Sequence, residues 1–135
     1  MRTERLPYGS MIGMEILELI NNYLGKHILA EYHNCDKNIL NSVEKIEQIM
    51  LEVAQKANVN VVEKCFHKFS PYGVSGVVVI TESHLAIHTW PEYNYAAVDF
   101  FTCNKNCSTK IATEHIKNLL KAEKYTFKTI KRGCK

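Results

Sequence analysis

Apolar runs in the middle of the chain, some continuous and some alternating with polar residues, predict a group of β-strands. Residues 74–80 are almost all small or β-branched, which is typical of a buried strand. Residues 84–90 alternate with a period of two, and Pro91 ends this second strand. One face of the second strand then carries four residues: His84, Ala86, His88 and Trp90.

Further segments with strand patterns extend this group to a sheet of about six strands. They are residues 26–32, 59–69, 95–103 and 125–130. In the segment 95–103 both faces are largely apolar. A sheet exposed to water on one side would carry polar residues on that side, so we expect this sheet to be covered on both faces.

Apolar residues spaced three and four apart predict two helices. The first is one long helix over residues 37–57, with Asp36 as its N-cap. The second begins after Ser108, and its apolar stripe runs to Leu120. The stretch Met11–Tyr23 is amphipathic and compatible with a short helix whose role the sequence does not indicate.

Two helices do not suffice to cover both faces of a six-stranded sheet. We therefore predict a two-layer α/β (α+β) sandwich, mainly antiparallel, with helices on one face and a second copy of the chain on the other. Its 135 residues are enough for one ordinary hydrophobic core. We expect an N-terminal extension, residues 1–24, followed by a single domain, residues 25–135.

Composition and charge exclude several classes of protein. The formal net charge is only +3 and the basic residues are dispersed, so we expect no nucleic-acid partner. No apolar run approaches the roughly 20 residues that a membrane span needs, and the sequence MRTERLPYGS lacks the apolar segment of a signal peptide. We expect a cytoplasmic protein with no membrane partner.

The cysteines and histidines argue against disulfides and against a metal. Five cysteines, an odd number, favour reduced thiols in a cytoplasmic chain. His84 and His88 share a strand face but lie four residues apart, which is ~13 Å at ~3.3 Å per residue. One ion cannot bridge that distance, so we expect no metal.

The segment GVSGVVVITESHLAIHTWPEYNYAAVDFFTC, residues 73–103, resembles the signature of the small prokaryotic S-adenosylmethionine decarboxylases. The similarity extends over nearly all of the predicted domain and includes GKHILAEYHNCD, which resembles the first strand of that family. Members build a pyruvoyl group from an internal serine and form symmetric dimers with two sheets face to face. The resemblance implies self-cleavage between Glu82 and Ser83 into two products, residues 1–82 and 83–135.

In the implied cleavage, the Ser83 hydroxyl attacks the carbonyl carbon of Glu82 and converts the amide to an ester. Loss of the Ser83 α-proton expels the upstream chain as a carboxylate, and hydrolysis of the resulting dehydroalanine leaves the pyruvoyl group. The resemblance implies that His88 abstracts this proton and that Ser75 assists with a hydrogen bond. It also implies that Cys103 is the proton donor of decarboxylation.

The implied activity is conversion of S-adenosylmethionine to its decarboxylated form, the aminopropyl donor for spermidine synthesis. Loss of carbon dioxide leaves a carbanion that no ordinary side chain can accept, so a carbonyl cofactor must form a Schiff base with the substrate amine. Pyruvoyl enzymes of this fold that act on arginine or another amino acid are an alternative. A non-catalytic partner subunit is a third interpretation, against which Ser83, His88 and Cys103 together argue.

The resemblance also implies residues that bind the nucleoside part of the substrate. Glu92 would accept hydrogen bonds from both ribose hydroxyls, and Phe69 and Trp90 would lie against the adenine or the sulfonium cation. Every functional residue named so far has an ordinary structural alternative. These are a turn serine, a buried cysteine, a core histidine, an exposed glutamate and core aromatic residues.

The implied roles conflict with strand geometry. Ser83 and His88 lie five residues apart, so a straight strand would put them on opposite faces and about 16 Å apart. Proton abstraction needs contact near ~3 Å. Either the strand begins with a sharp bend or the histidine comes from a second subunit. The apolar free face favours a homodimer with shared sites, in which one chain supplies Ser83 and Cys103 and the other supplies His88, Ser75, Glu92 and Phe69.

Overall fold

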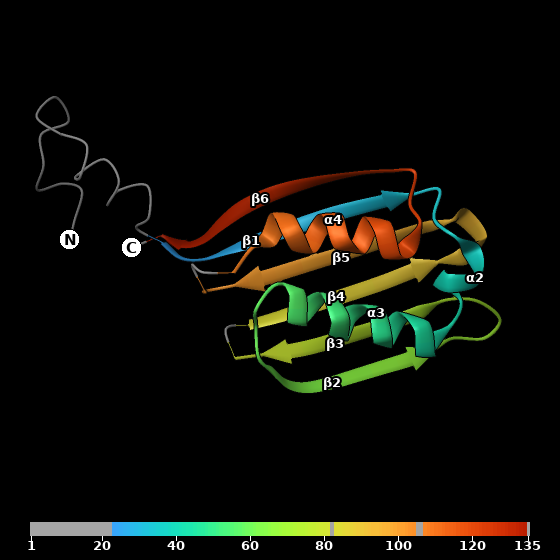
Figure 1. Ribbon diagram of the computed structural model, residues 1–135, viewed down its shortest axis with the longest axis horizontal. Coiled ribbons are helices and arrows are strands. Elements are labelled where there is room, and N and C mark those ends of the chain that lie inside the picture. Colours follow the sequence, from blue (N-terminus) through green and yellow to red (C-terminus); the bar gives the residue numbers. More distant parts are fainter. Residues whose placement is uncertain (1–22, 82, 105–106, 135) are drawn as a thin grey trace, which may run out of the picture.

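The computed structural model describes residues 23–81, 83–104 and 107–134, and shows a two-layer α/β sandwich (Figure 1). Six antiparallel strands form one sheet in the order β2-β3-β4-β5-β1-β6. The helices α3 and α4 lie side by side across one face of it (Figure 1). The predicted two-layer, mainly antiparallel fold is confirmed. None of the helices in these ranges is long and apolar enough to cross a membrane.

The elements follow one another along the chain with short connections. They are β1 (Tyr23–His33), α2 (Lys37–Leu40), α3 (Val43–Lys56), β2 (Val61–Lys68), β3 (Val74–Ile80), β4 (Ser83–Trp90), the 3₁₀ helix η3 (Pro91–Tyr93), β5 (Tyr95–Thr102), α4 (Thr109–Leu120) and β6 (Lys124–Cys134). The central strands β3, β4 and β5 lie within a residue or two of their predicted bounds, and Pro91 follows the last residue of β4 as expected. The strand predicted over 59–69 is shorter, because only residues 61–68 pair with β3.

The prediction of one helix over residues 37–57 was wrong. Two helices, α2 and α3, occupy that stretch, because Ser42 adopts an extended conformation and its hydroxyl accepts a hydrogen bond from the Lys45 amide at 3.2 Å. A serine that bonds the backbone in this way starts a new helix instead of continuing the old one. The predicted caps are confirmed. Asp36 accepts from two amides of α2, and Ser108 accepts from the Ile111 amide of α4.

The strands β1 and β6 are longer than the sequence pattern indicated. They pair along their whole length, from Tyr23 opposite Cys134 to His33 opposite Lys124. β6 is an edge strand with mostly exposed side chains, so its ends carry little apolar periodicity. Of the stretch 11–23 that was compatible with a helix, Tyr23 begins β1 and residues 11–22 lie outside the described ranges, as does nearly all of the expected extension 1–24.

The two faces of the sheet differ in chemistry. The face toward the helices is apolar and closed, and in β4 it carries the buried Leu85, Ile87 and Thr89. The opposite face, here called the helix-free face, carries the histidines of β4 and also Asp99 of β5. The helix-free face therefore mixes these polar residues with exposed apolar ones, among them Leu29, Val77 and Val79, and the expectation that this face is covered stays a prediction.

Thr89 joins three elements of the core through one hydroxyl group. The hydroxyl donates to the Leu40 carbonyl at the end of α2 at 2.8 Å and accepts from the Val74 amide of β3 at 2.9 Å. Thr89 itself is only 6% exposed. Because water does not reach these groups, the two backbone partners depend on this hydroxyl.

Replacing this hydroxyl with a methyl group should destabilise the fold. We expect Thr89→Val to lower the free energy of unfolding by about 1–3 kcal/mol, because it leaves a buried amide and a buried carbonyl without their partner. Urea unfolding at one protein concentration would measure the change, in chains that also carry Ser83→Ala so that the implied self-cleavage cannot occur. Thr126→Val on the exposed surface of β6 is the control and should change the free energy by less than about 0.5 kcal/mol. Equal effects of the two substitutions would contradict the role of Thr89.

Candidate active site

Ser83 is the first residue of β4, and its hydroxyl faces the thiol of Cys103. The Oγ and Sγ atoms are 3.8 Å apart. The contact forms because Ser83 pairs with Thr102, the last residue of β5, and Cys103 follows directly. Cys103 is exposed, so the alternative of a buried, apolar cysteine is wrong for this position. Cys35 contrasts with it, because burial raises the pKa of the Cys35 thiol to about 11.

The backbone of Ser83 has an unusual conformation. Its φ is 147°, a value that residues other than glycine rarely adopt. Regular alternation would direct this side chain toward the helices together with Leu85, whereas its hydroxyl lies beside Cys103. Such a conformation costs of the order of 1–3 kcal/mol and is held by the surrounding ladders. Glu82, on the other side of the expected cleavage bond, lies outside the described residues.

Ser75 and His88 form a second pair, near the other end of β4. They lie directly opposite each other in the β3–β4 ladder, and the Ser75 hydroxyl is 2.8 Å from Nδ1 of His88. Both point to the helix-free face and line a hollow of about 250 Å³ together with Cys65 and His67 of β2. His88 is exposed, so it is not a core histidine.

Within one chain, these two pairs do not meet. Ser83 pairs with Thr102 at the end of β5, whereas His88 pairs with Ala97 near its beginning. The extended strand between them corresponds to about 16 Å at ~3.3 Å per residue. The unusual φ of Ser83 does not bring the two pairs together, because His88 stays five ladder positions away.

The three candidate binding residues lie toward the His88 end of the sheet. Phe69 follows β2, is 46% exposed, and its ring packs against that of His67 at 4.6 Å. Trp90 ends β4 and is 39% exposed, and Glu92 is exposed on η3. The alternative of core packing is therefore wrong for both aromatic residues, and all three side chains are accessible.

Tyr95 and Glu31 form a further polar contact on the helix-free face. Burial, together with the hydrogen bond that the tyrosine hydroxyl donates to Glu31, raises the pKa of Tyr95 to about 12. Tyr95 therefore stays a neutral donor at physiological pH. Its ring also packs against Trp90 at 5.4 Å, and so supports the end of β4.

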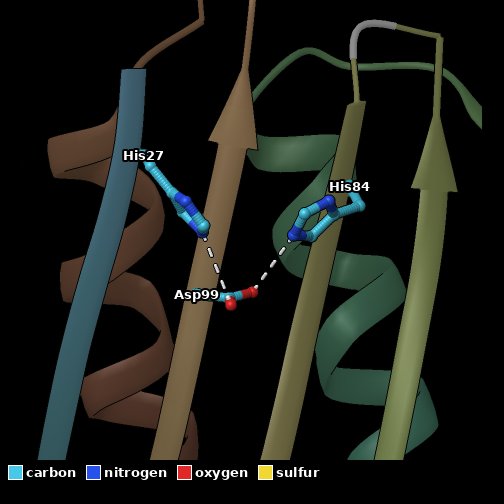
Figure 2. Close-up of side chains that lie close together, drawn as sticks. All are labelled: His27, His84 and Asp99. Carbon is cyan, nitrogen blue, oxygen red and sulfur yellow. Dashed lines mark ion pairs between the residues drawn. The ribbon is translucent and has the colours of Figure 1, made fainter. Parts of the chain in front are cut away.

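The sequence pattern did not indicate a cluster of His27, His84 and Asp99 (Figure 2). These residues come from β1, β4 and β5, and the two histidines flank the carboxylate. Nε2 of His27 is 3.4 Å from one oxygen of Asp99, and Nε2 of His84 is 3.3 Å from the other. Strand alternation predicts on which face of the sheet each of these side chains lies. Their proximity depends on the register between strands, which could not be predicted from the sequence pattern.

Fold and site together define a class of protein: a helix-backed antiparallel sheet that carries a serine–thiol pair at the start of a central strand. Comparisons with known proteins specify it further. Residues 26–133 match the family model described as S-adenosylmethionine decarboxylase. The chain belongs to the S-adenosylmethionine decarboxylase family.

Individual relatives agree with this assignment. An S-adenosylmethionine decarboxylase proenzyme of Caldicellulosiruptor saccharolyticus is 57% identical over 110 residues, which cover 82% of this chain and 89% of the relative. One from Thermotoga maritima is 52% identical over 101 residues, covering 75% and 78%. The crystal structure of the adenosylmethionine decarboxylase from Aquifex aeolicus superposes with a TM-score of 0.78 at 32% identity, covering 83% of this chain and 92% of that one.

Proposed function

We propose that this chain decarboxylates S-adenosylmethionine and so makes the aminopropyl donor for spermidine synthesis. The observation that carries the proposal is the Ser83–Cys103 pair, with its 3.8 Å separation, at the strained first residue of β4. Family membership supports the same activity. The proposal includes self-cleavage between Glu82 and Ser83, with the serine as precursor of the pyruvoyl group.

The strained conformation of Ser83 supports the cleavage step. A φ of 147° stores conformational energy beside the bond to be broken, and a cut there releases the strand end from this constraint. The Ser83 hydroxyl attacks the preceding carbonyl carbon, and His88 then removes the Ser83 α-proton. Ser75 holds His88 by the 2.8 Å contact to Nδ1, which leaves Nε2 of the ring available for the proton.

The residues around Ser83 fit a pyruvoyl group at this position. Ser83 is partly accessible at the open end of a strand, and an exposed thiol lies beside its side chain. When formed, the group supplies a ketone that accepts the electron pair released as carbon dioxide leaves the substrate. Cys103 is placed to deliver a proton to the substrate Cα, the step that completes decarboxylation. Glu92 binds the ribose hydroxyls, while Phe69 and Trp90 lie against the adenine or the sulfonium.

The distance between the two pairs supports a site shared by two chains. His88 lies about 16 Å along β4 from the serine that it must deprotonate, whereas proton transfer needs hydrogen-bond contact. The helix-free face of the sheet carries the Ser75–His88 pair, and no helix of the described ranges covers it (Figure 1). In a two-fold symmetric dimer packed through this face, the Ser83–Cys103 pair of one chain faces the Ser75–His88 pair of the other, twice.

Self-cleavage makes a direct prediction about mass. Purified protein should consist of two chains, residues 1–82 and 83–135, and the second should resist Edman degradation and react with carbonyl reagents. Intact-mass spectrometry measures both products. Ser83→Ala is the control and should remain one chain, because it lacks the attacking hydroxyl. A single wild-type chain after long incubation would contradict the proposal.

Loss of the Cys103 thiol should separate cleavage from turnover. We expect Cys103→Ala to be cleaved but to lose activity by roughly 10²–10⁴-fold, the usual contribution of a positioned proton donor. Misprotonation would also inactivate the enzyme progressively, which a time course of carbon dioxide release would detect. Cys103→Ser, with a weaker acid at the same position, should stay close to the alanine variant. Normal, sustained turnover of Cys103→Ala would assign the proton to another group.

The shared site predicts complementation between two inactive chains. In differently tagged homodimers, Ser83→Ala should stay uncleaved and His88→Ala should cleave poorly. In a purified heterodimer, one site combines the intact Ser83 of one chain with the intact His88 of the other, so the His88→Ala chain should be cleaved. Mass spectrometry of the tagged chains measures this. Absence of cleavage in the heterodimer would place the whole site in one chain.

A further inference from the structure

The cluster of His27, His84 and Asp99 lies beside the reactive centre, because His84 directly follows Ser83. Asp99 contacts both histidines through separate oxygens, at 3.3 and 3.4 Å (Figure 2). Its Oδ1 atom and Nε2 of His27 are closed to solvent and make no hydrogen bond within the described residues. Because water does not reach these atoms, the close contacts of the histidines with the carboxylate are what compensates their burial.

Arg132 determines how the protons of this cluster are arranged. A terminal nitrogen of its guanidinium lies 3.0 Å from Nδ1 of His27, and a guanidinium can only donate hydrogen bonds. Nδ1 of His27 is therefore the acceptor, and the ring proton is on Nε2, where it points at Asp99. The contacts run from Arg132 through His27 to Asp99, and the second oxygen of Asp99 lies 3.3 Å from Nε2 of His84.

The same contact argues against a metal ion in the cluster. A metal ligand at Nε2 of His27 would require the proton on Nδ1, where it would face the donors of Arg132. The ligand atoms of His27, His84 and Asp99 are close enough together to hold an ion. The donor that Arg132 directs at Nδ1 of His27 nevertheless favours the tautomer that cannot bind a metal through Nε2.

We propose that the Asp99–His84 contact anchors the start of β4 after cleavage and so keeps residue 83 beside Cys103. This inference rests on the proposed function. Before the cut, the turn from β3 tethers Ser83, which pairs with Ile80. Once the bond to residue 82 is broken, residue 83 is a free chain end. His84 is the first side chain of the new chain that a neighbouring strand holds, and its holder, Asp99, belongs to the strand that leads into Cys103.

His84 and Asp99 are thus positioning residues: they act through the distance between residue 83 and Cys103. A displacement of about 1 Å at a reacting centre can cost roughly 10²-fold in rate. A loose chain end should also allow protonation at the wrong atom. The number of turnovers before inactivation therefore reports this role, once the loss of activity during incubation without substrate is subtracted, because a general loss of stability also inactivates enzyme that is not turning over.

The experiment compares His84→Ala with His84→Gln, whose amide keeps an N–H donor near the position of Nε2. We expect His84→Ala to be cleaved, to lose roughly 10- to 100-fold in kcat and to inactivate after fewer turnovers of S-adenosylmethionine. His84→Gln should restore both quantities toward wild type. His115→Ala is the matched control: this histidine makes a 2.7 Å contact with Glu52 on α3, remote from β4, and its loss should leave the number of turnovers unchanged.

Hydrogen exchange provides a measurement that does not depend on activity. Amides at the start of β4 should exchange faster in cleaved His84→Ala than in cleaved wild type, but equally when both chains carry Ser83→Ala and stay uncleaved. Unchanged turnover number and unchanged exchange in His84→Ala would overturn the anchor. Failure of His84→Ala to cleave would also overturn the anchor, because it would assign His84 to processing. A loss of kcat and turnover number in EDTA-treated wild type equal to that of His84→Ala would overturn it too, because it would indicate a metal. If wild type itself neither cleaves nor decarboxylates S-adenosylmethionine, the proposed function fails instead.

Discussion

The register of β4 between β3 and β5 is the constraint on which this molecule depends. Leu85 and Ile87 are fully buried against the helices, and a slip of one residue would turn them to the opposite face. The apolar core therefore fixes where every other residue of β4 lies. The contacts of Ser83 with Cys103 and of His88 with Ser75 follow from packing on the far side of the sheet. Reactive groups are positioned here by residues that take no part in the chemistry.

Local pattern was enough to predict much of the fold. Alternation in residues 84–90 assigned the faces of β4, and the caps at Asp36 and Ser108 were read from residue type. Prediction failed where a side-chain cap competed with the apolar pattern, and where a contact joins strands far apart in the sequence. Ser42 divides an otherwise continuous apolar stripe, because a side-chain cap outweighs the pattern around it. The proximity of His27 to Asp99 could not be predicted, because it depends on pairing between strands about 70 residues apart.

Several polar groups of the helix-free face contact one another. Arg132 reaches His27, the two histidines flank Asp99, and Tyr95 donates to Glu31. Burial of a polar group is costly only when its hydrogen bonds are lost. Two atoms of this face, Nε2 of His27 and Oδ1 of Asp99, are closed to solvent without a hydrogen bond within the described residues, so their contacts with neighbouring charged or polar groups are what compensates their burial.

The strand order determines when the sheet can form relative to the proposed cleavage. A cut between residues 82 and 83 would leave β1, β2 and β3 in one piece and β4, β5 and β6 in the other, yet β1 lies between β5 and β6. Three of the five ladders would then join different polypeptides, so the pieces are interleaved and stay together without a covalent link. Such a sheet forms readily while the chain is continuous, because its strands then pair within one molecule. After cleavage and denaturation, the two pieces would have to associate in solution before the strands could pair. A protein cleaved at this bond would therefore refold poorly after denaturation.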